Sequence, residues 1–460
     1  MEHLDHPTGT DAPATDVLVS GAGIAGPALA YWLRRHGFTP TVVERAAGPR
    51  PGGQAVDLRG AGRTVIERMG LMERARALRV EQHGIALVDR RGRATARIPV
   101  GLFDGEGIVS EIEILRGDLA DLLREATDGV EYLWDDTVTA LDQDAGGVTV
   151  TFENAPARRF ALVVGADGLH SAVRRLAFRP GDGPDGTDGT DGTHYRPLGG
   201  CHAWFTVHDP ALARELDGWF LMYNAPGGLV AGARPGRLPG EVKASLGLRR
   251  APAAYDRRDT AAQRRLLAER FAGAGWEVDR LLAGMRTAGD FAFDTFGQVH
   301  LDHYSRGRVA LLGDAGYSPS PLTGLGTSLA LVGAYLLAGE LAAAAGDFRT
   351  AFARYEELMR PYATRAQELP PGGLGGYAPD SALAIRLRAA SMRWMGRWPL
   401  RPVLAAQFAK AGDIALPDYP LPARTARASG RTPPPGYAVR GWLKRSMLPD
   451  GSRKAQSRTP

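Results

Sequence analysis

The sequence predicts an α/β protein with a doubly wound, largely parallel sheet, an inserted block of mostly antiparallel strands, and C-terminal helices. Three observations lead to this prediction. The stretch 16–44 has the pattern strand, glycine-rich turn, helix, strand. Two later apolar strands, 161–165 and 308–312, each run into an acidic residue. Between them, residues 195–300 contain short alternating segments typical of antiparallel strands, whereas 327–411 is mostly helical, with breaks at its prolines, Pro361 included.

The first unit has the glycine spacing of a dinucleotide-binding turn. The apolar strand 17–19 is followed by GAGIAG at 21–26 and an apolar helical segment, and the next strand ends at Glu44. The first glycine permits a tight turn, the second lets the backbone approach a pyrophosphate, and the third lets the helix pack on the strand. The helix N-terminus offers free N–H groups to phosphate, and the carboxylate of Glu44 can accept hydrogen bonds from a ribose.

Composition narrows the function classes. The chain has 460 residues, of which 44% are hydrophobic and 23% charged, which is ordinary for a globular protein of two or three domains. The net charge is +5, but basic residues are interspersed with acids and form no aromatic-interleaved patch, which argues against nucleic acid as a partner. Cys201 is the single cysteine, so no internal disulfide or cysteine metal site is expected, and a reducing cytoplasm is predicted.

Two stretches bear on location. Residues 1–15 are polar and acidic and lack the apolar core of a signal peptide. Residues 325–345 are apolar enough to suggest a membrane span, but Glu340 interrupts them and their flanks carry no charged anchors. We therefore expect a buried helix and no stable membrane insertion.

The two later strands place acids where such a sheet binds ligands. Asp167-Gly168 follows the first of them, and Gly313-Asp314 follows the second. Carboxylates at the carboxyl ends of parallel strands can hold sugar hydroxyls, although for Asp167 a tight turn held by its side chain is an equally good interpretation. The long helix starting at Gly326 directs its positive end to the same edge, which suits a ring that gains negative charge on reduction, such as a flavin.

Together these motifs resemble a known family. They are, in chain order, Gly21-x-Gly23-x-x-Gly26, Arg116 in LRGDLA, Gly165-Ala-Asp167-Gly168 with Ser171 and Arg174, and Gly313-Asp314 with Pro319 and Gly324-x-Gly326. This order is similar to that of the FAD-dependent aromatic hydroxylases, the single-component flavoprotein monooxygenases related to 4-hydroxybenzoate hydroxylase. The tetracycline- and polyketide-modifying branch is the most similar. The resemblance covers about residues 16–417 and implies a Rossmann-like FAD-binding domain with an inserted β substrate domain.

The resemblance implies roles for individual residues. The residues predicted to bind the FAD pyrophosphate are Gly21, Ala22, Gly23, Ile24, Ala25 and Gly26. Arg116 would meet the pyrophosphate or the ribityl chain. The residue for the adenosine ribose is Glu44, and its neighbour Arg45 is also predicted to bind the cofactor. The residues for the ribityl chain and flavin ring are Gly313, Asp314, Pro321, Gly324, Leu325, Gly326 and Asp57. Asp167 and Gly168 are tied to FAD and to NAD(P)H. Arg50 or Arg59 would meet the nicotinamide cofactor, unless they are solvated loop arginines.

The implied activity is that of an FAD-dependent, NAD(P)H-consuming monooxygenase. It would hydroxylate an aromatic or polyketide-like small molecule with O2 through a flavin C4a-hydroperoxide, using NADPH or NADH, as a monomer or homodimer. Hydroxylation and Baeyer–Villiger insertion remain alternatives, and no catalytic side chain is assigned. A flavin dehydrogenase or reductase and a flavin- or ligand-binding protein without turnover are the rival interpretations. Aromatic residues of the middle block would line an apolar pocket or belong to its core: Trp204, Phe205, Phe220, Met222, Tyr223, Phe291, Phe293 and Phe296.

The sequence departs from the family at Tyr317, where many relatives have histidine, which puts any role of that histidine in doubt. No metal is expected, because His300 and His303 lack a third ligand. The Asp-Gly-Thr repeats at 181–194 predict a flexible surface insertion. The predicted segments are a disordered N-terminus (1–15), FAD-binding parts (16–82, 116–194 and 301–412, the last with C-terminal helices), substrate-domain parts (83–115 and 195–300) and a Pro-rich basic tail (413–460).

Overall fold

The computed structural model describes most of the chain as one compact unit within Met1–Pro422. The expected disordered N-terminus, the Asp-Gly-Thr repeats and the tail beyond residue 422 lie outside the described residues. The described ranges are 16–50, 52–103, 110–178, 195–252, 256–395 and 412–422.

The first layer is a six-stranded sheet of order β17-β18-β11-β1-β2-β7. All its neighbouring pairs are parallel except β17 with β18. The register pairs Ser20 with Gly165, and Gly165 with Leu311, so β1, β11 and β18 end side by side. The glycine turn, Asp167 and Asp314 follow these ends, so one sheet edge gathers all three motifs. The bounds are β1 (Asp16–Ser20), β2 (Thr39–Glu44), β7 (Glu131–Trp134), β11 (Leu162–Gly165), β17 (Ser305–Arg306) and β18 (Val309–Leu311).

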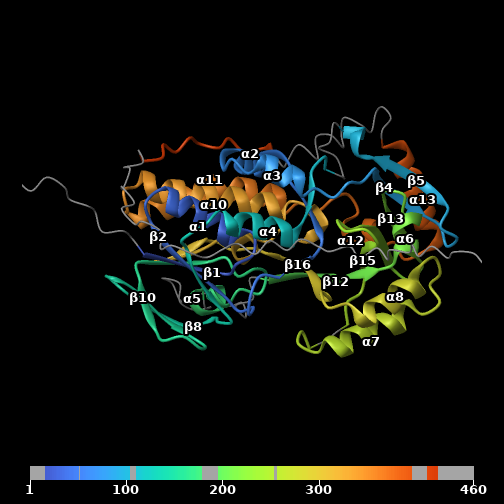
Figure 1. Cartoon of the computed structure of the whole chain (residues 1–460), viewed down its shortest axis with the longest axis horizontal. Coiled ribbons are helices and arrows are strands. Elements are labelled where there is room, and N and C mark those ends of the chain that lie inside the picture. Colours follow the sequence, from blue (N-terminus) through green and yellow to red (C-terminus); the bar gives the residue numbers. More distant parts are fainter. Residues whose placement is uncertain are drawn as a thin grey trace, which may run out of the picture. The chain divides into compact units, whose positions relative to one another are not determined.

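Helices cover both faces of this sheet, which confirms the predicted α/β fold class. Figure 1 shows α1, α4, α10 and α11 on one side of β1, and α5 with the strands β8 and β10 on the other. The small strands form a three-stranded sheet of order β10-β9-β8. The bounds are α1 (Ala25–Arg35), α2 (Gly60–Arg68), α3 (Met72–Ala77), α4 (Arg116–Glu125), α5 (Ala172–Ala177), α9 (Asp314–Tyr317), α10 (Gly326–Ala343), α11 (Phe348–Ala366), β8 (Val138–Asp144), β9 (Gly147–Phe152) and β10 (Arg158–Phe160).

The apolar stretch that starts at residue 325 forms α10, a core helix packed by α1, α2 and α11. Within the described residues it is the one helix long and apolar enough to cross a membrane, and 78% of that window is buried. Glu340, which interrupts the stretch, is buried and accepts a 2.6 Å hydrogen bond from the hydroxyl of Tyr419. Residues 412–422 therefore cover part of α10, and the described beginning of the expected tail belongs to the compact unit.

The second layer is a seven-stranded sheet of order β16-β12-β15-β14-β13-β4-β5. It is antiparallel except for the pair β13–β4. Alternate residues of β12, such as Cys201 and Phe205, pack in the core under α7 and α8. The residues between them, including His202 and Trp204, face the other way. The bounds are β4 (Gly84–Val88), β5 (Ala94–Pro99), β12 (Tyr195–His208), β13 (Trp219–Ala225), β14 (Leu229–Pro235), β15 (Glu241–Leu248), β16 (Ala292–Val299), α6 (Pro210–Glu215), α7 (Thr260–Phe271) and α8 (Val278–Thr287).

Short elements connect the two layers. The two-stranded sheet β3–β6 lies between them in the chain, and α12 contacts η2 next to the first layer. The helix α13 packs against β5 and β13 of the second layer. The bounds are β3 (Ala55–Asp57), β6 (Glu113–Leu115), η1 (Val100–Phe103), η2 (Pro321–Thr323), α12 (Gly373–Tyr377) and α13 (Ala382–Trp394).

The prediction that Pro361 breaks the helical region is wrong. The helix α11 runs through it from Phe348 to Ala366. Proline removes one backbone N–H, but Pro361 lies on the exposed face of α11, where water can satisfy the carbonyl that loses its partner. The buried face, which includes Phe352, Tyr355 and Met359, holds the helix against α10 despite the lost bond.

Candidate cofactor and active site

The glycine turn has the shape that a pyrophosphate requires. Gly21 has a φ of 106°, and its N–H donates a 2.7 Å hydrogen bond to the carbonyl of Val43. A Cβ on Gly26 would lie 1.9 Å from the Gly21 carbonyl oxygen, so α1 packs tightly on the turn. A Cβ on Gly23 would meet only the Arg116 guanidinium, at 3.5 Å. No side chain caps α1, so free N–H groups and a cation surround the space beside Gly23.

Glu44 lies in a pocket beside this turn. Its carboxylate accepts hydrogen bonds from the N–H groups of Ala22, at 2.9 Å, and Ala46, at 3.0 Å, and pairs with Arg50 at 3.2 Å. Arg45 is exposed and does not line the pocket. Trp134, which the sequence reasoning missed, pairs in register with Glu44 and brings an indole to the pocket. The lining residues are Ala22, Gly23, Glu44, Gly48, Pro49, Arg50, Arg116, Gly117, Ala120, Asp121, Arg124 and Trp134.

Arg116 lies between the glycine turn and Asp314. It begins α4, and its N–H donates a 2.8 Å hydrogen bond to the carbonyl of Gln54. The surrounding protein and the charge of Arg50 lower the pKa of Arg116, whereas Asp314 and Glu44 oppose that shift. The guanidinium remains a cation, and its side chain is open to solvent. It therefore supplies a fixed positive charge between two carboxylates.

The carboxylate of Asp167 is used within its own loop. It accepts hydrogen bonds from the Ser171 hydroxyl and from the N–H groups of Ala172, at 2.7 Å, and Val173, at 3.2 Å. The side chain of Arg174, which is buried, donates to the carbonyls of Leu169, at 2.6 Å, and Ala315, at 2.7 Å. Asp167 therefore caps α5, and Arg174 joins this loop to α9. This geometry favours the tight-turn interpretation for Asp167-Gly168.

Asp314 lies at the start of the flavin-facing loop predicted by the sequence. One oxygen of its solvent-exposed carboxylate is 3.7 Å from the place of a Cβ on Gly326, where α10 begins without a capping side chain. The surrounding protein raises the pKa of the Asp314 carboxyl, against the opposing effects of Ser318 and Arg116. Gly324 has a φ of 69°, and Asp57 lies 3.6 Å from the place of its Cβ. The structure thus brings Asp57, Asp314 and the segment 324–326 around one spot.

The two candidate arginines differ in their surroundings. Arg50 is exposed and pairs with Glu44, whereas Arg59 is buried and forms an ion pair with Asp57. Arg59 is therefore no solvated loop residue; it supports the side chain that lies next to Gly324. The glycine turn, Glu44 and Asp314 lie at one edge of the first sheet, and Asp57 reaches Gly324 from the separate sheet β3–β6.

The second sheet approaches this edge through a buried polar cluster. Lys243 donates hydrogen bonds to the Thr206 hydroxyl, at 2.8 Å, and to Glu241, at 2.7 Å. Asp290 accepts a 2.8 Å bond from the Thr206 N–H. A Cβ on Gly52 would lie 3.5 Å from the Lys243 amine and 3.3 Å from Asp290, so the Gly52 loop sits on the cluster. Sequence reasoning missed this contact, although a lysine within an apolar strand is an unusual feature.

Comparisons with known proteins agree with this geometry. Residues 14–198 match the family of FAD binding domains. A flavin-dependent monooxygenase of Legionella longbeachae is 36% identical over 352 residues, which are 76% of this chain and 87% of the relative. The chain belongs to the flavin-dependent monooxygenases. An uncharacterized protein of Mycobacterium tuberculosis, Rv1260, is 45% identical over 368 residues, which are 79% of this chain and 94% of that protein. The crystal structure of tetracycline destructase Tet(55) is 35% identical, with a TM-score of 0.72, 88% of this chain covered and 99% of that chain.

In this monooxygenase Tyr317 points into the core. It is 1% exposed, and its hydroxyl lies 2.9 Å from that of Tyr355, which donates to the carbonyl of Leu311. Burial raises the pKa of Tyr317 above its usual range. Gly333 of α10 leaves the room for the hydroxyl, because a Cβ there would lie 2.1 Å from it. Tyr317 therefore has a packing role, and it does not contribute to the ligand-binding edge.

The aromatic residues of the middle block divide between two faces of the second sheet. Phe205, Tyr223, Phe291 and Phe293 belong to the core under α7 and α8. On the other face His202 contacts Trp204, with ring centroids 3.5 Å apart, and Phe296, at 4.2 Å. Phe296 in turn meets Tyr377 at 5.5 Å. Burial lowers the pKa of His202 to about 3, so this ring is neutral at physiological pH.

Arg234 lies on the same face, near the end of β14, where the charge of Asp57 acts on it. It is buried, donates a 2.6 Å bond to Gln82, pairs with Glu113 and covers the ring of Phe220. The face therefore changes from charged, near the Gly52 loop, to aromatic, near Tyr377. The sequence alone did not predict this change from charged to aromatic side chains, because the change depends on the register of β12, β14 and β15.

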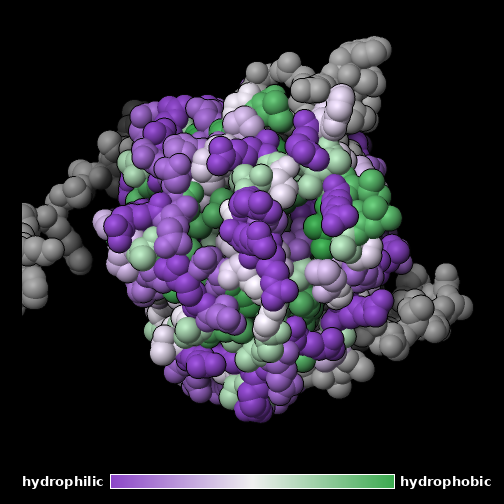
Figure 2. Space-filling model, turned by 90° about the vertical axis from the view of Figure 1, so that its right-hand side faces the viewer, coloured by the Kyte–Doolittle hydropathy of each residue, from purple (hydrophilic) through white to green (hydrophobic). Residues whose placement is uncertain are grey.

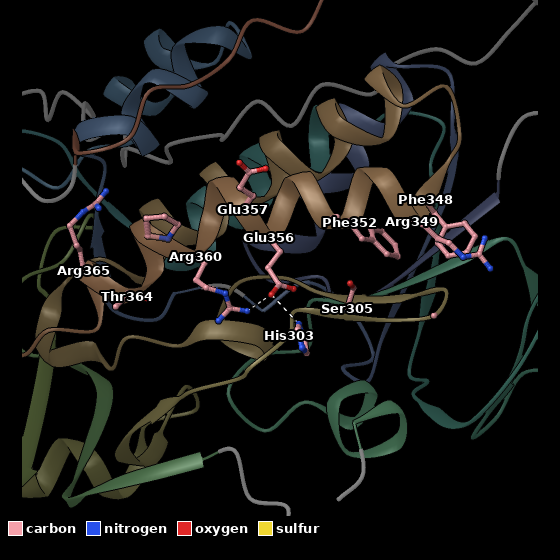
Figure 3. A pocket seen from close by; sticks show the side chains of 13 residues that line it. His303, Ser305, Phe348, Arg349, Phe352, Glu356, Glu357, Arg360, Thr364 and Arg365 are labelled. Atoms are coloured by element: carbon pink, nitrogen blue, oxygen red, sulfur yellow. Dashed lines mark hydrogen bonds and ion pairs between the residues drawn. The ribbon is translucent and has the colours of Figure 1, made fainter. Parts of the chain in front are cut away.

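A hollow larger than the Glu44 pocket lies elsewhere. It is a groove along α11 that contains none of the motif residues. Figure 3 shows Glu356 between His303 and Arg360, and both pair with it. Arg360 also donates to the carbonyl of Leu301, at 2.9 Å. These polar groups satisfy one another. Neither His303 nor His300 belongs to a metal-ligating group of three among the described residues.

Proposed function

We propose that this chain is an NAD(P)H-dependent monooxygenase that hydroxylates an aromatic or polyketide-like small molecule with O2. The observation that carries the proposal is the convergence of Asp57, Asp314 and Gly324 with the start of α10. The neighbouring elements α9 and η2 contact β16 of the second sheet and α12, which carries Tyr377. A flavin ring bound there would have the carboxylates of Asp57 and Asp314 close to it and the positive end of α10 at one edge. The aromatic side chains of the second sheet would form an apolar wall nearby.

The residues present fit FAD. The free N–H groups beside Gly23 and the Arg116 cation suit a pyrophosphate, and Glu44 and Asp314 supply acceptors for the hydroxyls of ribose and ribityl. FAD, when bound, supplies electron transfer and the activation of O2. The positive end of α10 would stabilise negative charge on the reduced ring, and the aromatic face would hold the substrate and exclude water.

We propose that NAD(P)H is the electron donor of this monooxygenase. Arg50 is exposed near the pocket of Glu44, so it remains a candidate for NAD(P)H, whereas buried Arg59 is better placed to orient Asp57. The name of the similar tetracycline destructase Tet(55) suggests a polyketide-like substrate. We expect a cytoplasmic protein that acts as a monomer or homodimer.

The test is an NAD(P)H oxidation assay on the FAD-loaded protein with phenolic compounds and tetracyclines as candidate ligands. A substrate should stimulate NAD(P)H oxidation and gain one oxygen atom, measured by mass spectrometry with ¹⁸O2. NAD(P)H oxidation that no ligand stimulates, with all electrons recovered as hydrogen peroxide, would favour a reductase. A protein that binds no FAD would refute the proposal.

A further inference from the structure

Trp134 ends β7 and is the one aromatic side chain among the described residues that line the Glu44 pocket. It pairs in register with Glu44, so both residues stand at the same edge of the first sheet. The other lining residues are charged or small. The pyrophosphate and ribose contacts proposed above do not use the indole, which therefore remains available to another part of a ligand.

The order of the strands indicates which part of FAD meets Trp134. The sheet contains the neighbours β1, β2 and β7 in this order. The glycine turn follows β1, Glu44 ends β2 and Trp134 ends β7. Neighbouring strands lie about 5 Å apart, so these three features follow one another in equal steps along the edge. With the pyrophosphate at the first and the ribose at the second, the base attached to that ribose lies at the third.

The indole is supported from behind before any ligand binds. Its ring lies 5.5 Å from the ring of Tyr132, centroid to centroid, and the two planes differ by 13°. The hydroxyl of Tyr132 lies 2.8 Å from that of Thr127, which donates to the carbonyl of Arg124 in the last turn of α4. Tyr132 itself does not line the pocket. A ring held in this way loses little conformational freedom when a ligand stacks on it.

The chain that follows Trp134 is tied to the chain that follows Glu44. The N–H of Asp135 donates a 2.9 Å hydrogen bond to the carbonyl of Ala46, and the N–H of Asp136 donates a 3.1 Å bond to that of Glu44. The buried carboxylate of Asp136 accepts four further backbone N–H bonds. The spacing between the ribose contact and the indole is therefore fixed by the fold.

We propose that Trp134 stacks on the adenine of FAD and makes the site selective for a flavin dinucleotide that carries a purine. This inference rests on the proposed binding of FAD. Indole and adenine are flat ring systems of similar size, and stacking removes apolar surface of both from water. NAD(P)H carries the same base, but the glycine turn and Glu44 next to Trp134 are the proposed contacts of FAD. The base at Trp134 is therefore assigned to FAD.

The test measures flavin binding by the full-length protein after its flavin has been removed. Trp134→Ala should weaken FAD binding at least ~10-fold, because it removes the aromatic partner of one base. Trp134→Phe keeps an aromatic ring and should bind FAD within about 3-fold of the unchanged protein. Flavin uracil dinucleotide has a smaller base, so Trp134→Ala should cost this analogue less affinity than it costs FAD.

The comparison of the two ligands separates stacking from a structural role, because a damaged fold would weaken both alike. Equal losses for FAD and the uracil analogue, or an unchanged FAD affinity in Trp134→Ala, would overturn the inference. A loss confined to NAD(P)H would also overturn it, because the base at Trp134 would then belong to the nicotinamide cofactor. An unchanged protein that binds no FAD would refute the proposed function as well, whereas FAD binding without oxygen transfer would refute the proposed reaction alone.

The matched control is Trp219→Ala, which removes an indole from β13 of the second sheet. Trp219 lies 5.2 Å from the guanidinium of Arg97 and does not line the Glu44 pocket. Figure 2, which views the side where β13 is drawn in Figure 1, shows separate apolar patches between hydrophilic ones. The control should bind FAD and the uracil analogue as the unchanged protein does. A loss of FAD affinity equal to that of Trp134→Ala would overturn the inference.

Discussion

At the scale of single residues, the site depends on which carboxylates are free to bind a ligand. Asp167 gives its oxygens to the start of α5, whereas Asp314 has an exposed carboxylate at a neighbouring strand end. Glu44 is intermediate, because it accepts two backbone bonds but still lines a pocket. Two acids in equivalent places of the sheet thus have different roles.

Replacing Glu44 tests the adenosine end of the site. Glu44→Ala should weaken FAD binding by about 1–3 kcal/mol, since it removes charge-assisted hydrogen bonds to a ribose. FAD titration followed by flavin fluorescence measures this loss. Arg45→Ala is the matched control, because Arg45 is exposed and does not line the pocket. An equal loss in both variants would place the ribose elsewhere.

Replacing Asp314 tests the ring end and relies on the proposed function. Asp314→Ala should weaken FAD retention and let the bound ring shift relative to α10, and a shift of about 1 Å can cost ~100-fold in rate. NAD(P)H oxidation should then release hydrogen peroxide instead of hydroxylated product. Product formed per NAD(P)H at saturating FAD is the measurement, with exposed Asp302→Ala as control. Normal coupling in the Asp314 variant would show that this carboxylate does not position the ring.

At the scale of elements, α10 organises the first layer. Its first residue lies at the loop that we propose to bind the flavin ring, and its buried body packs against α1, α2 and α11. Small residues along it make room for neighbours, as Gly333 does for the hydroxyl of Tyr317. The contacts of α10 in the core therefore fix the position of its N-terminus.

This close contact predicts a specific rescue. Gly333→Ala should destabilise the protein by about 1–3 kcal/mol, because the added methyl group would meet the Tyr317 hydroxyl. Tyr317→Phe removes that hydroxyl, so Gly333→Ala should cost less in this background than in the unchanged protein. Urea unfolding of the four proteins gives the coupling. Additive losses would mean that another neighbour, such as Leu312, limits the space.

At the scale of the whole molecule, two sheets meet with charged and aromatic groups between them. The Gly52 loop rests on Lys243 and Asp290, and His202 lies between Trp204 and Phe296. The pKa of His202 is lowered by burial, and the charge of Asp294 opposes this only in part. Lowering the pH should therefore lower the free energy of unfolding of the protein through His202, because its ring is held neutral in the fold.

The sign follows from proton linkage. Below the ordinary histidine pKa of 6.5 the unfolded chain binds a proton at His202 that the folded chain, with a pKa of about 3, does not bind. The free energy of unfolding should therefore fall by about 1 kcal/mol between pH 6 and pH 5 from this residue. Urea unfolding at both pH values should show this fall reduced by that amount in His202→Phe. The same pH dependence in both proteins would show that His202 is protonated in the fold.

The sequence by itself determined that its glycine and acidic motifs gather at one edge of the first sheet. Glycine spacing in the 21–26 turn and acids at the ends of apolar strands follow local rules of chain geometry, so they could be recognised without knowing their neighbours. The same local rules predicted the buried helix near Leu325, and the family comparison confirmed the monooxygenase interpretation.

Only the tertiary structure decided which side chains face the site. The inward turn of Tyr317, the pairing of Arg59 with Asp57 and the presence of Trp134 in the Glu44 pocket each depend on residues far away in the chain. The burial of His202 and Lys243 depends on the register of β12 with β15 and on the layer packed against them. Such contacts are set by packing between distant segments, and no local pattern of residues encodes them.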